Sequence, residues 1–420
     1  MSSSYLRNVA IASVFALITG LCTGTAASNA RADAACLAAT QASYTVMIPG
    51  RPFAVRELPD AVTAFVSINP ETPVQVPGIA VLKCTSGRFV YTHTIPLSPQ
   101  PTGLALTPDG KLLIVADDSY IAFLRTDRFS EDSTNAITYV KAERGDIEDD
   151  DAGAIYVSVT PDGRYAFVSE EQAGTLTVVD LVKAEATGPK NAIVGDISVG
   201  DSPITTLFSS DGKTLYGTIE RASQRLGYPR SCRTEGADPG DTMRFPPGAV
   251  FSLDLATAER ASGATLRFAA SQCSTVRMAL VPGEGRAWVT NRASGSVSLF
   301  DLEKLAESPE SSRVTDIAVG SNPVPVAVTR DGRYVLAGIT NRFGPGGATA
   351  GRIAVIDNHT TRIVGSIPVG KFPRDFSYGR EPTLFLSNNR SDSITVFNEN
   401  LIPSLITSPS PFHKPPKKRI

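Results

Sequence analysis

The stretch Ala166-Phe-Val-Ser-Glu-Glu-Gln-Ala-Gly-Thr-Leu-Thr-Val-Val-Asp180 aligns without a gap to Ala287-Trp-Val-Thr-Asn-Arg-Ala-Ser-Gly-Ser-Val-Ser-Leu-Phe-Asp301. Leu384-Phe-Leu-Ser-Asn-Asn-Arg-Ser-Asp-Ser-Ile-Thr-Val-Phe-Asn398 follows the same frame. Each copy is a β-rich run, a polar turn and a second alternating run, which is the pattern of a β-hairpin. The chain is therefore built on a repeated hairpin.

A further strand and an Asp-Gly turn precede these hairpins. The turn is found in Leu104-Ala-Leu-Thr-Pro-Asp-Gly110, Val157-Ser-Val-Thr-Pro-Asp-Gly163 and Val326-Ala-Val-Thr-Arg-Asp-Gly332, and more loosely in Leu207-Phe-Ser-Ser-Asp-Gly212. Asp-Gly between alternating strands is a strong hairpin signal, because glycine readily takes the positive φ that such turns need. Gly-x-x-Pro lead-ins end at Pro203, Pro323 and Pro373.

The repeating unit therefore has four strands and recurs about every 50 residues, as propeller blades do. Including degenerate units that start near residues 53, 275 and 374, seven units lie between residues 42 and 400. The sequence predicts an all-β fold, a seven-bladed β-propeller of four-stranded antiparallel blades. We expect residues 42–48 to supply the outer strand of the last blade and so close the ring.

The repeat resembles the YVTN-repeat family of seven-bladed propellers and the related lactonase-like group. The resemblance rests on the Gly-x-x-Pro lead-ins, the Pro-Asp-Gly turns, Trp288-Val-Thr-Asn291, and third strands that end in Asp180, Asp254, Asp301 or Asp357. It covers nearly all of the predicted mature chain. It implies the architecture and leaves function open, because propellers host hydrolases, isomerases, quinone-cofactor enzymes and binding modules.

The ends of the chain indicate export. Arg7 is followed by an apolar run from Val9 to Cys22 and by small-x-small patterns at residues 30–34, as in a signal peptide. The run is shorter than the ~20 residues that a membrane span needs, and Leu21 before Cys22 argues against a lipoprotein. We expect a signal peptide over 1–34, the propeller over 35–403, a disordered basic Pro-rich tail over 404–420, and a secreted or periplasmic location.

Four cysteines remain after residue 34, and an even number in an exported chain predicts two disulfides. In a four-stranded blade, the loops that connect strands two and three, and successive blades, share one end of the ring, the upper face. The other turns share the lower face. Cys232 and Cys273 map to the upper face of neighbouring blades, whereas Cys36 and Cys84 map to the lower face. We predict the pairs Cys36–Cys84 and Cys232–Cys273.

Acidic residues on the upper-face loops are one candidate site. The run Asp146-Ile-Glu-Asp-Asp-Asp151 with Glu170 and Glu171 would offer carboxylates to a hard cation such as calcium. In related propellers a calcium-dependent sugar-lactonase site uses acids and amides of this type, here Glu170, Asn291 and Asn388. The simpler interpretation is a solvated acidic loop with Asn and Asp as turn residues. We assign no metal ligand and no firm cofactor, with calcium as the cation to test.

Arginines are the second candidate. Arg221, Arg277, Arg292, Arg342 and Arg374 map to the upper face, and Arg277 and Arg374 begin first strands that border the channel. Arginine binds carboxylates and phosphates bidentately, so these two, with Asn291 and Asn388, are the predicted substrate-binding residues. Glu170 or Glu171 would be the catalytic acid or base. Scattered surface arginines are the alternative.

No complete catalytic set appears in the sequence. There is no Gly-x-Ser-x-Gly elbow, the chain has only three histidines, and His93 and His359 map to an outer strand and a lower turn. The leading hypothesis is a binding module that recognises an extracellular protein, a glycan or a small anionic ligand through the upper-face loops, including 221–248 and 342–351. The alternative is a lactonase or cycloisomerase acting on a small anionic substrate, and a quinone-cofactor dehydrogenase ranks third.

Lys plus Arg (40) nearly equal Asp plus Glu (42) in this 420-residue chain, with 42% hydrophobic residues. Such a balance produces no global field that would attract nucleic acid or an anionic membrane. We expect a monomer without a nucleic-acid partner and without stable membrane insertion.

Overall fold

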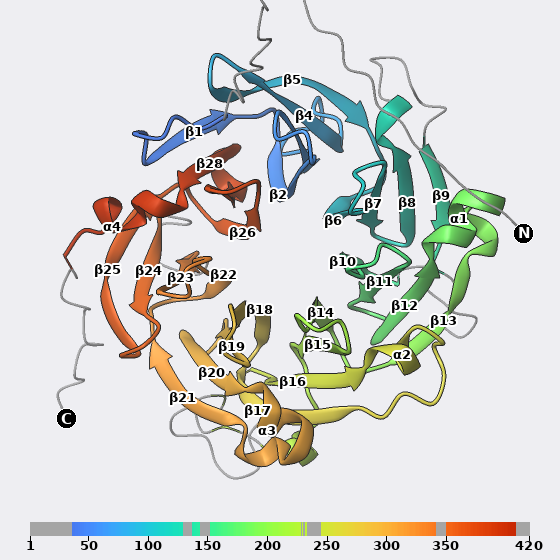
Figure 1. Ribbon diagram of the computed structural model, residues 1–420, viewed down its shortest axis with the longest axis vertical. Coiled ribbons are helices and arrows are strands. Elements are labelled where there is room, and N and C mark those ends of the chain that lie inside the picture. Colours follow the sequence, from blue (N-terminus) through green and yellow to red (C-terminus); the bar gives the residue numbers. More distant parts are fainter. Residues whose placement is uncertain are drawn as a thin grey trace, which may run out of the picture. The chain divides into compact units, whose positions relative to one another are not determined.

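Seven four-stranded antiparallel sheets form a β-propeller in the computed structural model (Figure 1). The structure describes residues 36–128, 137–142, 152–227, 229, 232, 245–341 and 350–408. The first strands of neighbouring blades contact one another around the ring, so they border the central channel. The predicted fold class is confirmed.

The first four blades follow one another in the chain. Their strands are β2 (Arg51–Glu57), β3 (Thr63–Asn69), β4 (Gly78–Thr85) and β5 (Arg88–Pro96); β6 (Pro101–Leu106), β7 (Leu112–Asp117), β8 (Tyr120–Arg125) and β9 (Ile137–Lys141); β10 (Ala154–Val159), β11 (Tyr165–Glu170), β12 (Thr175–Asp180) and β13 (Ile193–Ser198); and β14 (Pro203–Phe208), β15 (Thr214–Ile219), β16 (Pro247–Asp254) and β17 (Arg267–Cys273).

The remaining three blades include the ring closure. Their strands are β18 (Thr275–Val281), β19 (Arg286–Asn291), β20 (Ser296–Asp301) and β21 (Arg313–Ala318); β22 (Pro323–Val328), β23 (Tyr334–Ile339), β24 (Gly351–Asp357) and β25 (Arg362–Val369); and β26 (Pro373–Tyr378), β27 (Thr383–Asn388), β28 (Ser393–Asn398) and β1 (Ser43–Met47). Strand β1 pairs with β28, with Thr45 opposite Thr395. The N-terminal strand therefore closes the ring, as predicted.

The Asp-Gly turns owe their shape to one side chain each. In the first, Asp109 accepts hydrogen bonds from the Thr107 hydroxyl at 2.7 Å and from the Lys111 amide at 3.1 Å. Gly110 follows with φ 71°, a left-handed conformation that glycine adopts without strain. The same pattern recurs at Asp162 and Asp331.

The aspartates that end third strands begin helices on the lower side. Asp180 caps α1 (Leu181–Thr187) by accepting from the Lys183 amide at 2.9 Å, and Asp301 caps α3 (Leu302–Glu307) in the same way. Asp254 caps the short α2 (Leu255–Ala258). This N-cap role, worth about 1 kcal/mol, explains why Asp recurs in the repeat.

A repeated hydroxyl joins neighbouring blades. On the second strand of five blades, a buried Ser or Thr donates to a backbone carbonyl at the start of the next blade. The bonds run from Ser67 to Thr102 (2.5 Å), Ser169 to Ile204 (2.8 Å), Thr218 to Val276 (2.9 Å), Thr290 to Val324 (2.8 Å) and Ser387 to Phe53 (2.8 Å). Each contributes about 1 kcal/mol, and together they hold the inner strands around the channel.

Every innermost strand contains a register shift near its upper end, at equivalent places in the seven blades. In four blades the amide at the shift donates to the second-strand hydroxyl, as Arg277 does to Thr290 at 3.2 Å and Asp375 to Ser387 at 3.1 Å. Such bulges change the direction in which a side chain points. The shifted residues are those that form the candidate site below.

Two disulfides are present, Cys36–Cys84 and Cys232–Cys273, which are the predicted pairs. Cys36 precedes β1 and Cys84 lies in β4, so the first disulfide fixes the closing strand to the first blade. At the C-terminal end, α4 (Ile402–Leu405) follows the last blade, and Thr407 forms a bridge to Ser366 of β25. Residues 404–408, which belong to the predicted tail, therefore contact the sixth blade through this bridge.

Among the described residues no helix is long and apolar enough to cross a membrane. The predicted signal peptide (1–34) lies outside the described residues, as do residues 409–420 of the predicted tail.

Candidate functional site

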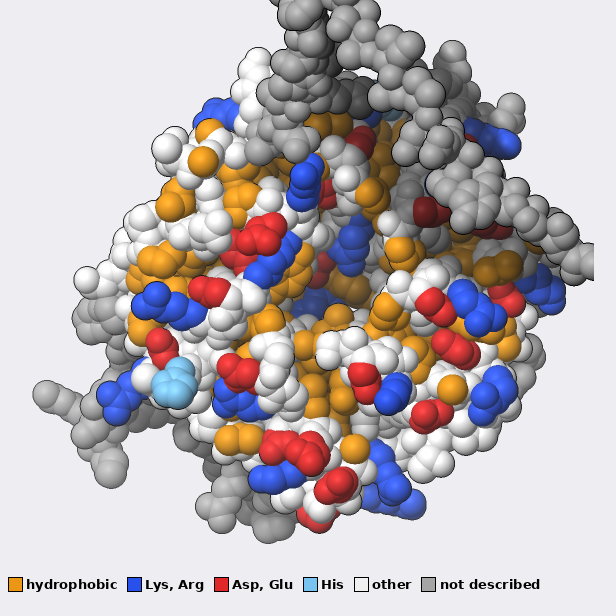
Figure 2. Space-filling model, viewed as in Figure 1, with side chains coloured by type: hydrophobic (Ala, Val, Ile, Leu, Met, Phe, Trp, Pro, Cys, Tyr) orange, Lys and Arg blue, Asp and Glu red, His pale blue; other side chains and the backbone are white. Residues whose placement is uncertain are grey.

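A cavity of about 520 Å³ occupies the channel toward the lower face. Its walls are the lower halves of the seven innermost strands, from Arg56 of the first blade round to Tyr378 of the last. Figure 2 shows a hollow at the centre of the ring where basic and acidic side chains lie among hydrophobic ones. Pockets of 300–1,000 Å³ commonly hold small molecules, so this cavity is large enough for a ligand.

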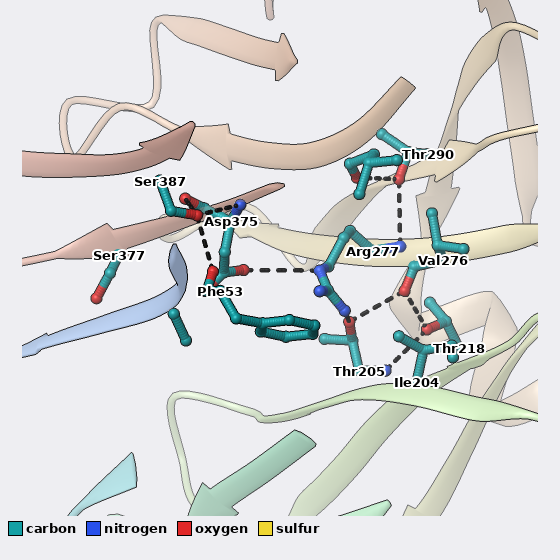
Figure 3. A network of polar contacts seen from close by, with 12 residues as sticks. Phe53, Ile204, Thr205, Thr218, Val276, Arg277, Thr290, Asp375, Ser377 and Ser387 are labelled. Atoms are coloured by element: carbon teal, nitrogen blue, oxygen red, sulfur yellow. Dashed lines mark hydrogen bonds and ion pairs between the residues drawn. The ribbon is translucent and has the colours of Figure 1, made fainter. Parts of the chain in front are cut away.

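The inner end of the cavity, which lies away from the lower face and is hereafter called the floor, is made by residues at the register shifts. Tyr156, Thr205, Arg277 and Asp375 occupy equivalent positions in β10, β14, β18 and β26, and each is at least nine-tenths buried. Figure 3 shows the Arg277 guanidinium between Asp375 on one side and Thr205 on the other. Four blades thus bring one cation, one anion and two hydroxyls together at the same level of the channel.

Arg277 is held on three sides. Its Nε lies 3.6 Å from Asp375 Oδ1, its Nη1 makes a long hydrogen bond of 3.5 Å to Thr205 Oγ1, and its Cζ lies 3.7 Å from the centre of the Tyr156 ring. Only 4% of the residue is exposed. Nε and Nη2 have no hydrogen-bond acceptor among the described residues. An unsatisfied buried donor destabilises the folded protein, and a bound anion would accept hydrogen bonds from it. This guanidinium is therefore a candidate anion-binding group.

Two aromatic rings extend this arrangement. Phe53 and Tyr156 pack with ring centres 5.6 Å apart, and Arg374 Cζ lies 4.2 Å from the centre of the Phe53 ring. Burial and the nearby charge of Arg277 lower the pKa of Arg374 to about 10. Arg374 remains a cation at neutral pH and adds positive potential near the floor.

The Tyr156 hydroxyl is a second unused group on the floor. It is buried near the Asp375 carboxyl, and it forms no hydrogen bond of normal geometry among the described residues. Burial raises the pKa of Tyr156, with the negative charge of Asp375 acting in the same direction and Arg277 opposing it. Tyr156 is therefore a neutral donor, available beside the guanidinium.

The net charge around the floor is positive. Arg56 Nη1 lies 4.0 Å from Asp375 Oδ2 and donates to Ser377 Oγ at 3.1 Å. Three arginines, at 56, 277 and 374, thus surround one aspartate. The excess of cations favours a negatively charged ligand.

At the mouth of the cavity, Glu57 is the carboxyl of β2. Burial raises its pKa to about 7, although the Arg380 amide, which donates to Glu57 Oε2, opposes the shift. Glu57 therefore changes its protonation state near neutral pH. A carboxyl of this kind is able to act as an acid or a base.

The structure brings two of the predicted residues together. Arg277 lies on the cavity floor. Arg374 is close enough to Arg277 for the Arg277 charge to lower the pKa of Arg374. Arg292, another arginine assigned to the upper face, forms an ion pair with Glu220, whose pKa burial raises. Glu171 is half-buried and its charge acts on Glu220. Glu171 thus belongs to this upper group of charges.

The predicted Glu170, Asn291 and Asn388 end the second strands of three blades and make the same kind of contact. Asn291 Nδ2 donates to Ser298 at 2.8 Å, and Asn388 Nδ2 donates to Thr395 at 2.8 Å. Glu170 accepts from Thr175 at 2.8 Å and Thr177 at 2.5 Å. These bonds tie each residue to the third strand of its own blade, and none of the three lines the cavity.

Within the described residues, no group of three or more His, Cys, Asp or Glu side chains is close enough to hold a metal ion. The acidic run 146–151 and most of the insertions at 228–244 and 342–349, Arg342 included, lie outside the described residues. The calcium hypothesis and the role of those loops therefore stay predictions.

Sequence reasoning missed Asp375, Tyr156, Thr205, Glu57 and Arg56. One signal was available: aligned on the Gly-x-x-Pro lead-ins, Thr205 and Asp375 both fall two residues after the proline, the position that Pro325 occupies in the sixth blade. Polar residues at the same place in several blades face the same level of the channel.

No protein-family model matches the chain, and no curated protein matches its sequence. Among solved structures, the chain is similar to Kuenenia stuttgartiensis hydrazine synthase, with a TM-score of 0.59 and 17% sequence identity. The match covers 84% of this chain and 96% of that chain. At this identity the similarity supports the propeller fold alone, and the YVTN-repeat family stays a resemblance.

Proposed function

We propose that this chain is an exported binding propeller whose central cavity holds a small organic anion on Arg277. The observation that carries the proposal is the buried guanidinium at the floor of a 520 Å³ cavity, with Nη2 free of acceptors among the described residues and Nε making only a 3.6 Å ion pair to Asp375. A carboxylate there would receive charge-assisted hydrogen bonds from Arg277 and a further one from Tyr156. The two disulfides favour an oxidising compartment and hence export.

This proposal moves the binding site from the upper-face loops to the channel. Protein or glycan recognition by the upper insertions is a separate hypothesis, because those loops lie mostly outside the described residues. The channel hypothesis rests on geometry that four blades share.

Calorimetric titration of the purified protein with small carboxylates and phosphates tests the proposal. We expect at least one to bind, and Arg277→Met to weaken that binding at least 100-fold, since a charge-assisted bidentate contact is lost. Arg267→Met, at an exposed position at the start of β17, is the matched control and leaves affinity unchanged. If no anion binds, or if both variants bind as the wild type does, the proposal is wrong.

Glu57 supports the alternative function, lactone hydrolysis or cycloisomerisation of a small anionic substrate. Its pKa of about 7 and its place on the wall of the same cavity suit an acid or base acting on a substrate anchored by Arg277. Turnover that falls at least 100-fold in Glu57→Gln, while substrate affinity is retained, would favour the enzyme. Binding without turnover of any lactone tested would favour the binding module.

A further inference from the structure

Most polar side chains on the cavity wall already have partners within the protein. Ser158 and Thr206 bond to each other at 2.6 Å, and Arg56 Nη1 donates to Ser377 and to the Val55 carbonyl. The unused donors lie on the floor, on Arg277 and Tyr156. The buried donors without partners among the described residues therefore lie at one end of the cavity.

The lower part of the cavity is a collar of large side chains at equivalent strand positions. Five blades contribute apolar or aromatic residues that line it: Leu106, Val159, Phe208, Leu280 and Tyr378. All five are partly exposed, so each has surface that a ligand would cover. Burial of that surface against an apolar ligand is favourable by the hydrophobic effect.

Glu57 occupies the equivalent position in the first blade and is the one carboxyl of the collar among the described residues. If a ligand carried a second negative charge, that charge would lie between the apolar side chains of the collar and near the Glu57 carboxyl. Desolvation disfavours such a charge, and Glu57 adds repulsion in those molecules in which it is ionised. The collar therefore selects against polyanions such as citrate or a sugar phosphate.

We propose, resting on the function proposed above, that the ligand is an amphipathic monocarboxylic acid. Its carboxylate lies on the floor against Arg277 and Tyr156, and its alkyl or aryl body fills the collar toward the lower face. The cavity volume of about 520 Å³ exceeds what an inorganic anion occupies, and the body of the ligand accounts for the remainder.

A homologous series tests the chemistry. Titration with butanoate, hexanoate and octanoate gives an affinity that rises about fourfold per methylene, which is the equivalent of about 0.8 kcal/mol per buried CH₂. Phenylacetate binds in the range of hexanoate, and hexanamide, citrate and inorganic phosphate bind at least tenfold more weakly than hexanoate.

Two variants locate the apolar contact. Leu280→Asn reduces the gain per methylene while affinity for butanoate changes less than threefold, and Val314→Asn, at an exposed position on the outer strand β21, leaves the series unchanged.

Citrate or phosphate binding as tightly as octanoate, with loss in Arg277→Met, would overturn the monocarboxylate while anion binding in the channel stands. A flat chain-length series, or a series that Leu280→Asn does not alter, would also overturn it. Failure of every anion to bind would instead remove the proposed function on which this inference rests.

Discussion

Replacing Arg277 by methionine is expected to abolish ligand binding at little cost in stability. The change removes an ion pair to Asp375 at 3.6 Å, a 3.5 Å hydrogen bond to Thr205 and stacking on Tyr156. The stacking contributes about 0.5–2 kcal/mol. In the variant, the Asp375 carboxylate still has the Arg56 guanidinium 4.0 Å away as an oppositely charged partner.

The same substitution also relieves a cost. Nη2 of Arg277 is a buried donor without an acceptor among the described residues, and such a group destabilises the fold by about 1–3 kcal/mol. Methionine fills similar space with an adaptable apolar chain. Loss and gain nearly cancel, and we expect the free energy of unfolding to change by less than about 1.5 kcal/mol.

Arg330→Met is the matched comparison, because Arg330 is a fully engaged arginine. Its guanidinium pairs with Glu399 and donates to the Gly379 carbonyl at 2.5 Å, and it stacks on Tyr378. Its loss strands the buried Glu399 carboxylate and lowers the free energy of unfolding by about 2–4 kcal/mol, since breaking a buried pair is costly.

Urea unfolding at pH 7, followed by fluorescence of the single tryptophan, the fully buried Trp288, measures both changes. If Arg277→Met loses 3 kcal/mol or more, as a structural ion pair would, Arg277 serves the fold and the reasoning about its free donors fails.

Three further predictions concern other residues. Burial raises the pKa of Glu57 to about 7 in the folded protein, so the protonated carboxyl favours folding. The stability that this protonated carboxyl contributes is complete below about pH 4.5 and is lost as pH rises through 7. Glu57→Gln should therefore be more stable than the wild type by about 1–3 kcal/mol at pH 8.5 and equal to it at pH 4.5, and a pH-independent difference in urea unfolding would contradict this. Replacing Cys36 and Cys84 by serine removes a link between residues 48 apart, which should lower the free energy of unfolding by about 4 kcal/mol and speed amide exchange in β1; unchanged exchange there would show that the disulfide does not secure the ring closure. The Thr177 hydroxyl lies 2.5 Å from Glu170 and 2.7 Å from Asp196, but it has only one hydrogen to donate to the two carboxylates. Glu170→Gln adds a donor and should therefore keep or raise the melting temperature, whereas Glu170→Ala should lower it by several degrees. Equal losses in both variants would show that the two carboxylates do not compete for this hydrogen.

The architecture was predictable because each blade repeats the same local instructions. Asp-Gly turns, capping aspartates such as Asp180, and second-strand hydroxyls such as Ser169 do the same structural job in several blades. Their spacing alone gave the number of blades, the closing strand and the cysteine pairs. The recurring residues make the same contacts in each blade or between neighbouring blades. Aligning the repeats of the sequence with one another therefore reveals them.

The site was less predictable for a physical reason. Simple alternation along a strand does not reveal the register shift that places Asp375 and Tyr156 on the channel floor. Arg277 was identified by its charge, but its partner Asp375 lies almost 100 residues away in the chain and meets it across the ring. Asn291 and Asn388 look like ligand-binding amides in sequence, yet both bond to their own blades.

Crystals soaked with 4-bromophenylacetate test the central claim most directly, because bromine gives an anomalous signal that locates the ligand without bias. The account predicts a bromine peak within the collar and carboxylate density beside Arg277 Nη2 and the Tyr156 hydroxyl, both absent in crystals of Arg277→Met. Bromine peaks confined to the outer surface, with the channel free of ligand density at saturating concentration, would contradict it.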